Sequence, residues 1–355
     1  MYTSVTRRQE DAMGARGEPG ETATVFDVAI EAGVSTATVS RVANNHPNIR
    51  LATRERVEEA MDRLGYVPNM RARSLAGGKT NVLGLIVDDL ESSYNNQVAR
   101  GIDEAVASHG YDLLLSTMHR RQRTTRHIES LLNGFAEGLI VLLSGGFGKY
   151  LGEVEARGFP VVLIDHAPAS NVPIVKADND AGTRDGVRHL KSLGHHRVGF
   201  ITGSLDVASG AERLTSFRTE AAALGLDADE GLIVEGDFRV EGGAKAARQL
   251  LGLESPPTAI FASSDLEAFG VIRVARELGI SIPRDLSLIG FDDIPEASNV
   301  TPPLTTVRQP MREMGLLAAE MLITAVEEGQ PKTSAVELPT QLIVRETTGP
   351  PSSTA

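Results

Sequence analysis

Apolar residues recur at helical spacing in three short segments near the start of the chain. Within each segment they follow i, i+3, i+4 and i+7 or part of that series, which places them on one face of a helix. In order along the chain they are Val25, Val28, Ala29, Ala32, Val39, Val42, Ala43, Val57, Ala60, Met61 and Leu64. Gly33 interrupts the pattern at a turn, Ser35 suits the N-cap of the second helix, and Gly65 suits the C-cap of the third. The pattern predicts a domain of three short helices that pack through these faces.

The second of these helices has an outward face of small residues, hydrogen-bonding groups and one cation. The face consists of Thr36, Ala37, Thr38, Ser40, Arg41 and Asn44. Small side chains let a helix approach base edges in the DNA major groove, hydroxyls and amides can donate or accept there, and Arg can form two hydrogen bonds with guanine. The spacing alone leaves open a plain three-helix bundle whose polar face is only hydrated.

From Asn81 onward, short continuous apolar runs alternate with stretches of helical periodicity. The runs span 82–87, 112–116, 138–143, 161–165, 198–202, 232–236, 259–262 and 286–292, and the helical stretches span 94–109, 121–133, 180–193, 211–224, 242–251 and 265–278. Such runs are typical of strands buried in a parallel sheet, and their alternation with helices predicts repeated βαβ units. The stretch is too long for one doubly wound sheet, so we predict two lobes, with the first break near Asp180 to Gly182. Ligands bind beyond the carboxyl ends of such strands, and a cleft between two lobes can bring two sets of these ends together.

Composition narrows the class of protein. A length of 355 residues suggests two or three domains, and a hydrophobic content of 41% is enough for a sizeable core. The sequence contains no cysteine, which excludes disulfides and thiolate metal sites and fits a reducing cytoplasm. No apolar run reaches the length of a signal peptide in residues 1–23 or of a transmembrane span anywhere, so we expect a cytoplasmic protein without a membrane segment. Residues 1–23 are rich in Gly, Glu and Arg and are predicted to form a flexible tail.

The net charge of −12 is unevenly distributed along the chain. Residues 24–79 contain eight Lys or Arg against six Asp or Glu, whereas residues 80–355 carry most of the negative excess. Phosphates attract a mildly basic head and repel an acidic body, so this distribution favours one orientation on nucleic acid. Many cytosolic enzymes also have acidic surfaces, so the asymmetry does not decide the function by itself.

The order of residues in the helical segments resembles the helix-turn-helix of the LacI/GalR family of bacterial transcription regulators. The matching string is D-V-A-x-x-A-G-V-S-x-x-T-V-S-R-V-x-N, from Asp27 to Asn44. Three further stretches are similar to the third helix and the hinge of the family, namely 53–57, 64–69 and 72–75. The resemblance extends from Thr24 to about Thr347. It implies an α/β protein with a small all-α helix-turn-helix head and two doubly wound parallel-sheet lobes, which resemble a type I periplasmic sugar-binding protein.

The segment between Pro68 and Lys79 has the composition of a linker. In the family the matching segment forms a short helix on the operator. The resemblance implies that two such helices of a dimer enter the minor groove, where Leu75 wedges between base steps and kinks the DNA. The helix face and the resemblance together predict DNA contacts from Thr24, Ser35, Thr36, Ala37, Thr38, Ser40, Arg41, Asn44, Asn48, Thr53, Tyr66, Asn69, Ala72 and Leu75.

The predicted domains follow from these boundaries. They are a flexible tail at 1–23, a helix-turn-helix domain at 24–68, a hinge helix and linker at 69–79, an effector-binding and dimerisation domain at 80–348, and a second tail at 349–355. The resemblance implies that the chain crosses between the lobes again near Val307 and Thr333. The first lobe is therefore predicted to comprise about 81–180 and 309–332, and the second lobe about 181–308 and 333–348.

Polar and aromatic residues follow the predicted strands at the ends where a ligand would bind. They are Tyr94, Asn95, Ser144, Asp165, Arg213, Phe238, Ser264, Asp265, Asp292 and Gln309. Carboxylates accept hydrogen bonds from sugar hydroxyls, Arg donates to sugar oxygens, and an aromatic ring covers the apolar face of a sugar. The same residues could instead have purely structural roles. Either Asp265 or Asp292 could cap a helix, Arg213 could pair with a structural carboxylate, and Phe238 could belong to the core.

The resemblance assigns roles to six of these candidates. It implies effector contacts from Asp165, Arg213, Asp265, Asp292 and Gln309, and stacking of Phe238 on the ligand.

Three positions depart from the patterns of the family. Asn95 stands where purine-binding relatives carry an aromatic residue, and Val207 stands where such a relative places a second Arg. Both differences favour a sugar over a nucleobase as the effector. Ser264 replaces the Asn that often precedes this Asp, which leaves the contacts to the ligand hydroxyls open.

Other groupings of reactive residues do not support an enzyme. Adjacent residues of a strand point to opposite faces, so neither Asp292-Asp293 nor His195-His196 converges readily on one atom. The glycine-rich stretch at 145–148 lacks the Lys-Ser or Lys-Thr of a P-loop and the full dinucleotide fingerprint. No Ser or Cys nucleophile with a base is recognisable. We therefore predict a protein that is not an enzyme and has no cofactor and no metal site.

The combined prediction is a cytoplasmic, homodimeric transcription regulator. It binds near-palindromic operator double-stranded DNA, represses carbohydrate-utilisation genes, and is released by a small-molecule effector, a sugar. No heptad helix follows the last predicted strand, so we expect a dimer and not a coiled-coil tetramer. Three alternatives stay open: a corepressor-dependent regulator, an exported sugar-binding protein, which the missing signal peptide and the head argue against, and a sugar-modifying enzyme.

Overall fold

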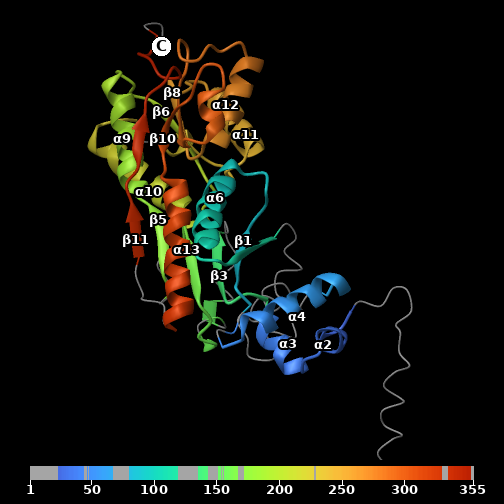
Figure 1. Ribbon diagram of the computed structural model, residues 1–355. Helices are drawn as coiled ribbons and strands as arrows, with labels where there is room; N and C mark the ends of the chain where they lie inside the picture. Colours follow the sequence, from blue (N-terminus) through green and yellow to red (C-terminus); the bar gives the residue numbers. More distant parts are fainter. Residues whose placement is uncertain are drawn as a thin grey trace, which may run out of the picture. The chain divides into compact units, whose positions relative to one another are not determined.

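The structure is a computed structural model that describes residues 23–43, 46, 48–66, 80–118, 135–142, 151–152, 154, 156–166, 172–227, 229–329 and 335–352. It contains two compact units, one within Met1–Thr80 and one within Asn81–Ala355. We call the first unit the head and the second unit the body. The head is blue in Figure 1, and the body contains both β-sheets.

The head consists of three helices, as the apolar pattern predicts. They are α2 (Val25–Ala32), α3 (Thr36–Ala43) and α4 (Leu51–Leu64). The buried apolar residues of the head are Val28, Ala29, Ala32, Val39, Val42, Val57 and Ala60. Leu64 differs from the prediction, because it lies at the end of α4 and is 36% exposed.

The turns between these helices form at the predicted residues. Gly33 and Gly65 end α2 and α4 with φ values of 62° and 61°, a left-handed conformation that glycine adopts without a steric penalty. The Ser35 hydroxyl accepts a hydrogen bond from the backbone N–H of Thr38 at 3.2 Å and caps α3.

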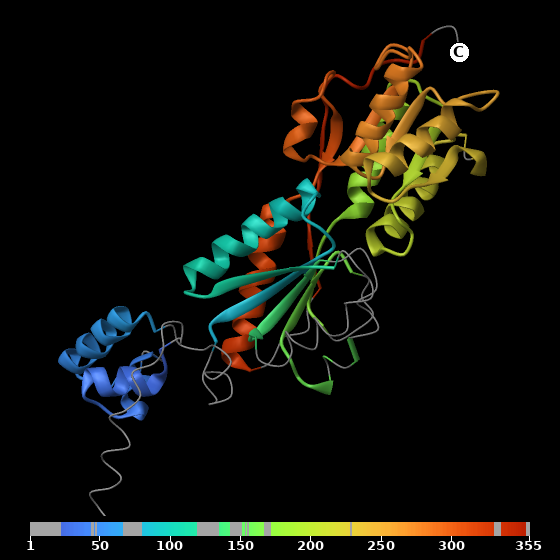
Figure 2. The same cartoon turned by 90° about the vertical axis from the view of Figure 1, so that its right-hand side faces the viewer.

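The first lobe of the body is built on a parallel sheet with the strand order β11-β5-β4-β3-β1-β2. Its strands are β1 (Val82–Val87), β2 (Asp112–Thr117), β3 (Gly138–Leu142), β4 (Val161–Ile164), β5 (Ile174–Ala177) and β11 (Ala335–Leu338). Two helices, α6 (Ser93–Ser108) and α13 (Met311–Glu328), lie side by side on one face of the sheet (Figures 1 and 2).

Two glycines permit the close approach of α6 and α13. A Cβ atom on Gly101 would lie 2.0 Å from the carbonyl oxygen of Arg312, and one on Gly315 would lie 2.1 Å from that of Val98. A larger residue at either position would therefore push the two helices apart. The approach fixes the first turn of α6, which carries two of the candidate ligand-contacting residues.

The second lobe is built on a sheet with the strand order β12-β10-β9-β8-β6-β7, in which only β12 is antiparallel to its neighbour. Its strands are β6 (Val198–Thr202), β7 (Ile233–Glu235), β8 (Ala259–Ala262), β9 (Ser287–Asp292), β10 (Thr305–Arg308) and β12 (Gln341–Ile343). Helices α9 (Asn179–Ser192) and α10 (Ala208–Ala223) cover one face, and α11 (Val240–Leu251) and α12 (Asp265–Glu277) cover the other. Short 3₁₀ segments are η2 (Glu230–Leu232) and η3 (Pro295–Ser298).

The chain crosses between the lobes three times. The first crossing lies between β5 and α9, close to the predicted break, and the second lies between β10 and α13, close to the predicted Val307. The third prediction, near Thr333, was wrong. Strand β11 is hydrogen-bonded to β5 and extends the first sheet, so the chain returns to the second lobe only between Leu338 and Gln341.

Each of the eight predicted strand segments contains an observed strand, and five of the six predicted helices are present within a few residues of their predicted ends. The sixth, at 121–133, lies outside the described residues. No helix in the part of the chain that the structure describes has the length and apolar character needed to cross a membrane.

Candidate functional site

A cavity of about 380 Å³ lies where the two lobes of the body face each other. Its wall includes strand ends, the first turn of α6, and the turn that precedes α11. Eight of the ten residues predicted to contact an effector line it: Tyr94, Asn95, Asp165, Arg213, Phe238, Ser264, Asp292 and Gln309. Ser144 lies outside the described residues, and Asp265 is not part of the wall.

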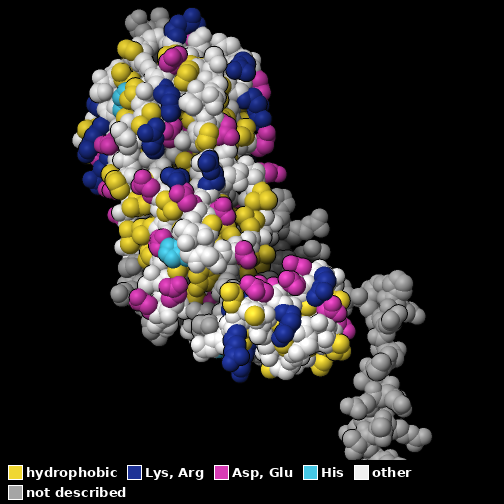
Figure 3. Space-filling view, viewed as in Figure 1, with side chains coloured by type: hydrophobic (Ala, Val, Ile, Leu, Met, Phe, Trp, Pro, Cys, Tyr) yellow, Lys and Arg dark blue, Asp and Glu magenta, His cyan; other side chains and the backbone are white. Residues whose placement is uncertain are grey.

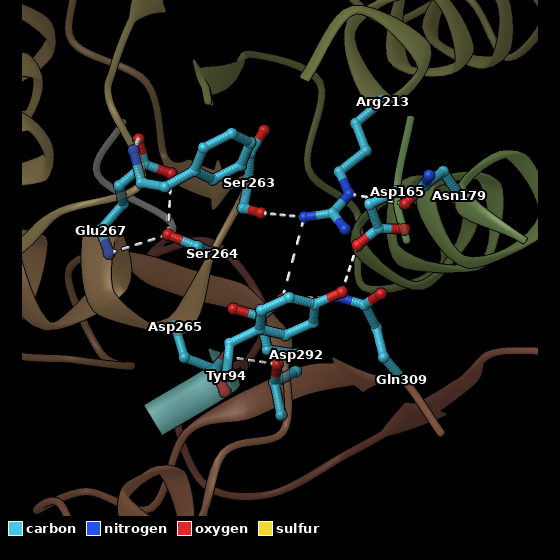
Figure 4. Close-up of polar contacts among 12 residues, drawn as sticks. Tyr94, Asp165, Asn179, Arg213, Ser263, Ser264, Asp265, Glu267, Asp292 and Gln309 are labelled. Carbon is cyan, nitrogen blue, oxygen red and sulfur yellow. Dashed lines mark hydrogen bonds and ion pairs between the residues drawn. The ribbon is translucent and has the colours of Figure 1, made fainter. Parts of the chain in front are cut away.

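Arg213 from α10 is held in one orientation at the centre of the site (Figure 4). Its Nε donates to Asn179 Oδ1 at 2.8 Å, and its Nη1 donates to the carbonyl oxygen of Ser263 at 2.6 Å. The guanidinium carbon lies 3.7 Å from the centre of the Phe291 ring, and Nη1 lies 3.9 Å from Asp292 Oδ1. The side chain is only 3% exposed, so the protein positions it before any ligand arrives.

Asp292 ends β9 and is fixed by Gln309, the residue that follows β10. Gln309 Nε2 donates to Asp292 Oδ1 at 2.6 Å. Burial raises the pKa of Asp292 to about 7, and the positive charge of Arg213 opposes that rise. Asp292, Asp165 and Phe238 all have positive φ angles, of 121°, 57° and 61°. Non-glycine residues in this region store backbone strain and concentrate at functional sites, which fits their place on the cavity wall.

Asp165 and Tyr94 meet on the first-lobe side of the cavity. The Tyr94 hydroxyl donates to Asp165 Oδ2 (Figure 4), and burial raises the pKa of both groups. Among the described residues, the second carboxylate oxygen, Asp165 Oδ1, has no hydrogen-bond partner, and Gln309 Oε1 likewise has none. Buried acceptors of this kind need a donor, which a ligand with several hydroxyl or N–H groups can supply.

Phe238 is placed by Glu267, a residue that the strand-end reasoning missed. Glu267 Oε1 accepts from the backbone N–H groups of Asp237 and Phe238, at 3.0 Å each, and its Oε2 accepts from the Ser264 hydroxyl at 3.0 Å. Glu267 is completely buried, and burial raises its pKa to about 8. The Ser264-x-x-Glu267 spacing of a capping box is the sequence signal that could have identified it.

Asp265 has a different role from the predicted one. Its carboxylate accepts from the backbone N–H of Ile294 at 2.9 Å and from the Thr306 hydroxyl. The side chain is fully buried, and this desolvation together with the charge of Asp292 raises its pKa well above the usual range. Asp265 therefore supports the loop after β9 from behind the cavity wall, where its oxygens are already used.

An ion pair joins the lobes at the edge of the cavity. Arg239, next to the Phe238 turn, donates to Asp89 Oδ2 at 2.5 Å, and its Nη1 lies 3.8 Å from Glu91 Oε2. Asp89 follows β1 and is 150 residues from Arg239 in the sequence. Nothing in the local sequence pattern links residues so far apart, so this contact could not be predicted.

Asn95 and Val207, the two positions that argued against a nucleobase, both line the cavity. The Asn95 side chain is buried and donates through Nδ2 to the carbonyl oxygen of Asp89 at 3.2 Å. It therefore fixes the loop after β1 in addition to facing the cavity.

In the head, the predicted DNA-contacting residues divide into exposed and half-buried sets. Exposed are Thr24, Ser35, Ala37, Ser40, Arg41 and Asn48, and half-buried are Thr36, Thr38, Thr53 and Tyr66. Asn44, Asn69, Ala72 and Leu75 lie outside the described residues.

The predicted DNA-contacting side chains differ in whether they already form hydrogen bonds within the head. The Thr24 hydroxyl donates to Asp27 Oδ2 at 2.6 Å in a capping box, whereas no side-chain hydrogen bond or ion pair joins Arg41 to another described residue. The Lys and Arg side chains visible on the head in Figure 3 are interspersed with Asp and Glu side chains. Recognition of DNA by this face would therefore depend on individual side chains such as Arg41 more than on a continuous basic patch.

In the pairs His195-His196 and Asp292-Asp293, which resemble metal or catalytic sites in sequence, His195 and Asp293 form hydrogen bonds with structural residues. His195 bonds with Thr258 Oγ1 at 2.8 Å and with Ser287 Oγ at 3.0 Å. Asp293 points away from the cavity-lining Asp292 and accepts from Arg308 and Arg345 at 2.7 and 2.6 Å. Among the described residues, no cluster of three or more His, Asp or Glu side chains could hold a metal ion.

Comparisons with known proteins agree with this arrangement. The model of "Bacterial regulatory proteins, lacI family" matches residues 24–69, and that of "Periplasmic binding protein-like domain" matches residues 187–348. Catabolite control protein A of Priestia megaterium is 34% identical over 328 residues, which cover 92% of this chain and 99% of that protein.

Two solved structures are similar over almost the whole chain. A lac repressor dimer bound to operator and the anti-inducer ONPF has a TM-score of 0.81 and 29% identity, and the match covers 93% of this chain and 100% of that chain. A complex of the transcriptional regulator CelR with cellobiose has a TM-score of 0.71 and 31% identity, and the match covers 92% and 99%.

Proposed function

The chain belongs to the lacI family of bacterial regulatory proteins, and from this premise we propose that it is a homodimeric repressor of carbohydrate-utilisation genes which a sugar releases from its operator. It is a DNA-binding transcription regulator and not an enzyme. The proposal concerns the effector, the direction of its effect and the residues that carry both.

The polar cavity is the observation that carries the proposal. Arg213 offers a fixed donor, Asp165 Oδ1 and Gln309 Oε1 are acceptors without partners, and the Phe238 ring forms part of the same wall. A polyhydroxylated ligand satisfies the donors and acceptors, and its apolar face packs on the ring. The similar regulator CelR was solved with cellobiose, which supports a sugar here.

The head supplies the operator contacts. In the proposed complex, α3 lies in the major groove with Arg41, Ser40 and Ala37 toward the bases, and the other predicted contact residues reach the backbone and the minor groove. The similar lac repressor dimer was solved on its operator, which supports two heads on a near-palindromic site. We further propose that residues 24–68 form the DNA-binding domain and residues 69–79 form the hinge. In the hinge, Leu75 is the residue that inserts into the minor groove. The protein acts on DNA in the cytoplasm.

A sugar can weaken operator binding only if it binds the two arrangements of the protein with different affinities. A hundredfold release corresponds to about 2.7 kcal/mol of coupling, which is within the usual range for allosteric proteins. The cavity is suited to such coupling because both lobes contribute to its wall, so a ligand contacts groups that move when the angle between the lobes changes.

The test begins with operator DNA selected by the full-length protein from random duplexes. Fluorescence anisotropy then measures binding to labelled operator while mono- and disaccharides are added, and a releasing sugar supports the proposal. Asp292→Asn is nearly isosteric and should abolish release while operator affinity stays within about twofold of the unmodified protein. Glu277→Gln, at an exposed pair with Arg248, is the matched control and should behave normally. A ligand that tightens operator binding would instead indicate a corepressor-dependent regulator.

A further inference from the structure

The cavity wall contains more acidic than basic side chains. Among the described lining residues, seven are Asp or Glu and two are Arg. Asp165 and Asp292 are the two central carboxylates. The other five come from the loop after β1 in the first lobe and from the turn before α11 and its first turn in the second lobe. We call them the acidic rim: Asp88, Asp89, Glu91, Asp237 and Glu241. Glu241 is paired with Arg273, which lies outside the wall.

Both cations of the wall already have anionic or carbonyl partners. Arg239 is paired with Asp89 and lies near Glu91, while Arg213 bonds Asn179 and Ser263 and lies beside Asp292 in the centre of the site. No Lys lies among the described lining residues. A phosphate group entering the cavity would therefore have to displace an existing ion pair to find a cationic partner.

Some of the backbone N–H groups near the cavity are also occupied by carboxylates of the chain. Phosphates often bind the N–H groups in front of a helix. Before α6, Asp89 Oδ1 accepts from the N–H groups of Glu91 and Ser92 at 2.9 and 3.2 Å. Before α11, Asp237 Oδ1 accepts from the N–H of Arg239 at 3.0 Å. In these two turns the chain's own carboxylates therefore take N–H groups that an anionic ligand could otherwise use.

The groups that do lack partners in the wall are acceptors. Asp165 Oδ1 and Gln309 Oε1 are buried and make no hydrogen bond within the part of the chain that the structure describes. Gln309 is only 3% exposed, so water has little access to it. Such atoms attract hydroxyl donors and repel the oxygens of a phosphate, which only accept when fully ionised.

From these observations we infer that the effector is an uncharged, unphosphorylated sugar, and that the acidic rim excludes phosphate esters of the same sugar. The inference rests on the proposed function and deepens it, because it selects among the sugars of a pathway. A regulator of this kind responds to a sugar before a kinase acts on it. A phosphate monoester carries a charge of about −1.5 to −2 at pH 7, so the carboxylates of the acidic rim repel it.

Isothermal titration of the full-length protein with matched pairs tests the inference. Each pair consists of a neutral sugar and its phosphate ester, such as ribose with ribose 5-phosphate and glucose with glucose 6-phosphate. For every neutral sugar that binds, the ester should bind at least about tenfold more weakly, since close like charges cost several kcal/mol. An ester that binds as tightly as its parent sugar, or more tightly, overturns the inference.

Two controls separate charge from bulk. A neutral ester at the same position, such as the acetate, should bind more tightly than the phosphate ester. The gap in binding affinity between the two esters should narrow as the salt concentration rises. The double variant Glu91→Gln with Asp237→Asn should also narrow that gap, because both residues belong to the acidic rim and neither substitution changes side-chain size. Glu277→Gln, which lies outside the cavity wall, should leave the gap unchanged. Equal exclusion of both esters at all salt concentrations would contradict the electrostatic account.

The two levels of failure can be told apart by adding labelled operator to the same samples. A phosphate ester that binds and releases operator leaves the proposed function standing and refutes only this inference. If neither sugars nor esters bind, the proposed function fails, and the inference fails with it.

Discussion

At the scale of single residues, the ligand site depends on side chains that the chain itself holds in place. Glu267 is not part of the cavity wall. It nevertheless accepts hydrogen bonds from the backbone N–H groups of Asp237 and Phe238, in the turn that places the Phe238 ring. Its Ser264 contact ties the same turn to the start of α12. Glu267 is therefore a positioning residue for the aromatic ring.

Replacement of Glu267 should separate this positioning role from charge. Glu267→Gln keeps an acceptor for the two N–H groups, and its amide N–H₂ can donate to the Ser264 oxygen in place of the bond that Oε2 accepts, so effector affinity should stay within about twofold. Glu267→Ala leaves the buried N–H groups without an acceptor, and effector affinity should fall about tenfold or more, as expected for a cost of 1–3 kcal/mol. Isothermal titration provides the comparison. Equal affinity of Glu267→Ala and the unmodified protein would remove Glu267 from the site.

The same residue predicts a pH dependence of stability. Burial raises the pKa of Glu267 from 4.5 to about 8, so between these values the folded protein retains a proton that the unfolded chain releases. The free energy of unfolding therefore falls as the pH rises through this window. Glu267→Gln cannot titrate, so its stability relative to the unmodified protein should improve by on the order of 2–4 kcal/mol between pH 5 and pH 8.5. Urea denaturation of the body at both pH values measures this. A constant difference would show that the carboxyl group is not buried as described.

The sequence predicted which residues gather at one cavity where strand ends determine their position. Eight of the ten predicted effector contacts line one cavity, because polar residues at the carboxyl ends of parallel strands necessarily face the same edge. Asp265 is not part of the wall, and its oxygens accept from Ile294 and Thr306, contacts of which the sequence gives no sign. The Asp89–Arg239 pair was missed because it forms between distant loops of the two lobes.

At the scale of helices and strands, the apolar runs predicted every described strand that is buried along its whole length. Strands such as β1 and β9 consist mainly of apolar residues and are buried at every position. The strands that were not predicted are short or polar. Strand β5 contains Lys176, β10 begins with Thr305-Thr306, and β11 is an edge strand of alternating burial, so none shows a continuous apolar run. The third crossing was predicted too early for the same reason, because β11 has no continuous apolar run that would identify it as a strand of the first lobe.

The packing of α6 on α13 should be sensitive to a single methyl group. Gly101→Ala would place a Cβ atom 2.0 Å from a backbone oxygen of α13, so we expect a loss of about 1–3 kcal/mol in the free energy of unfolding. Gly152→Ala is the matched control, because nothing lies within 4 Å of its added methyl group. Thermal denaturation measures both variants. Equal stability of the two would show that the helices do not approach so closely.

Recognition of DNA by α3 should depend on Arg41. Its side chain is exposed, and no hydrogen bond or ion pair joins it to another described residue, so its guanidinium can bind a base. Arg41→Ala should weaken operator binding by about 1–3 kcal/mol and relax the preference at one base pair of each half-site. Binding to a set of singly substituted operators measures both effects. Uniform weakening at every sequence would assign Arg41 to the phosphate backbone instead.

At the scale of the whole molecule, a chain of polar contacts links the ligand site to the junction of the lobes. Arg213 bonds Asn179, Asn179 Nδ2 donates to Glu212 Oε2 at 2.8 Å, and Glu212 Oε1 accepts from Lys176 Nζ at 3.2 Å. Lys176 lies on β5 of the first lobe and Glu212 on α10 of the second. The arrangement gives an occupied site a physical route by which to alter the lobe angle.

Lys176→Met should therefore weaken the response to the effector more than its binding. We expect the fold-release of operator at saturating sugar to fall, while sugar affinity stays within about threefold. Glu337→Gln is the matched control, because it removes the Lys176 pair within the first lobe and leaves the pair with Glu212 between the lobes. Unchanged release in Lys176→Met would exclude this route.

The central claim is that sugar binding and operator binding oppose each other through the body. The most direct test is the affinity of the releasing sugar for the free protein and for the saturated operator complex, measured by titration calorimetry under one salt condition. Linkage requires the sugar to bind the operator complex more weakly, by the same factor by which the sugar weakens operator binding. Equal affinities would contradict the claim by showing that the sites are uncoupled, and tighter binding to the operator complex would show that the sugar acts as a corepressor.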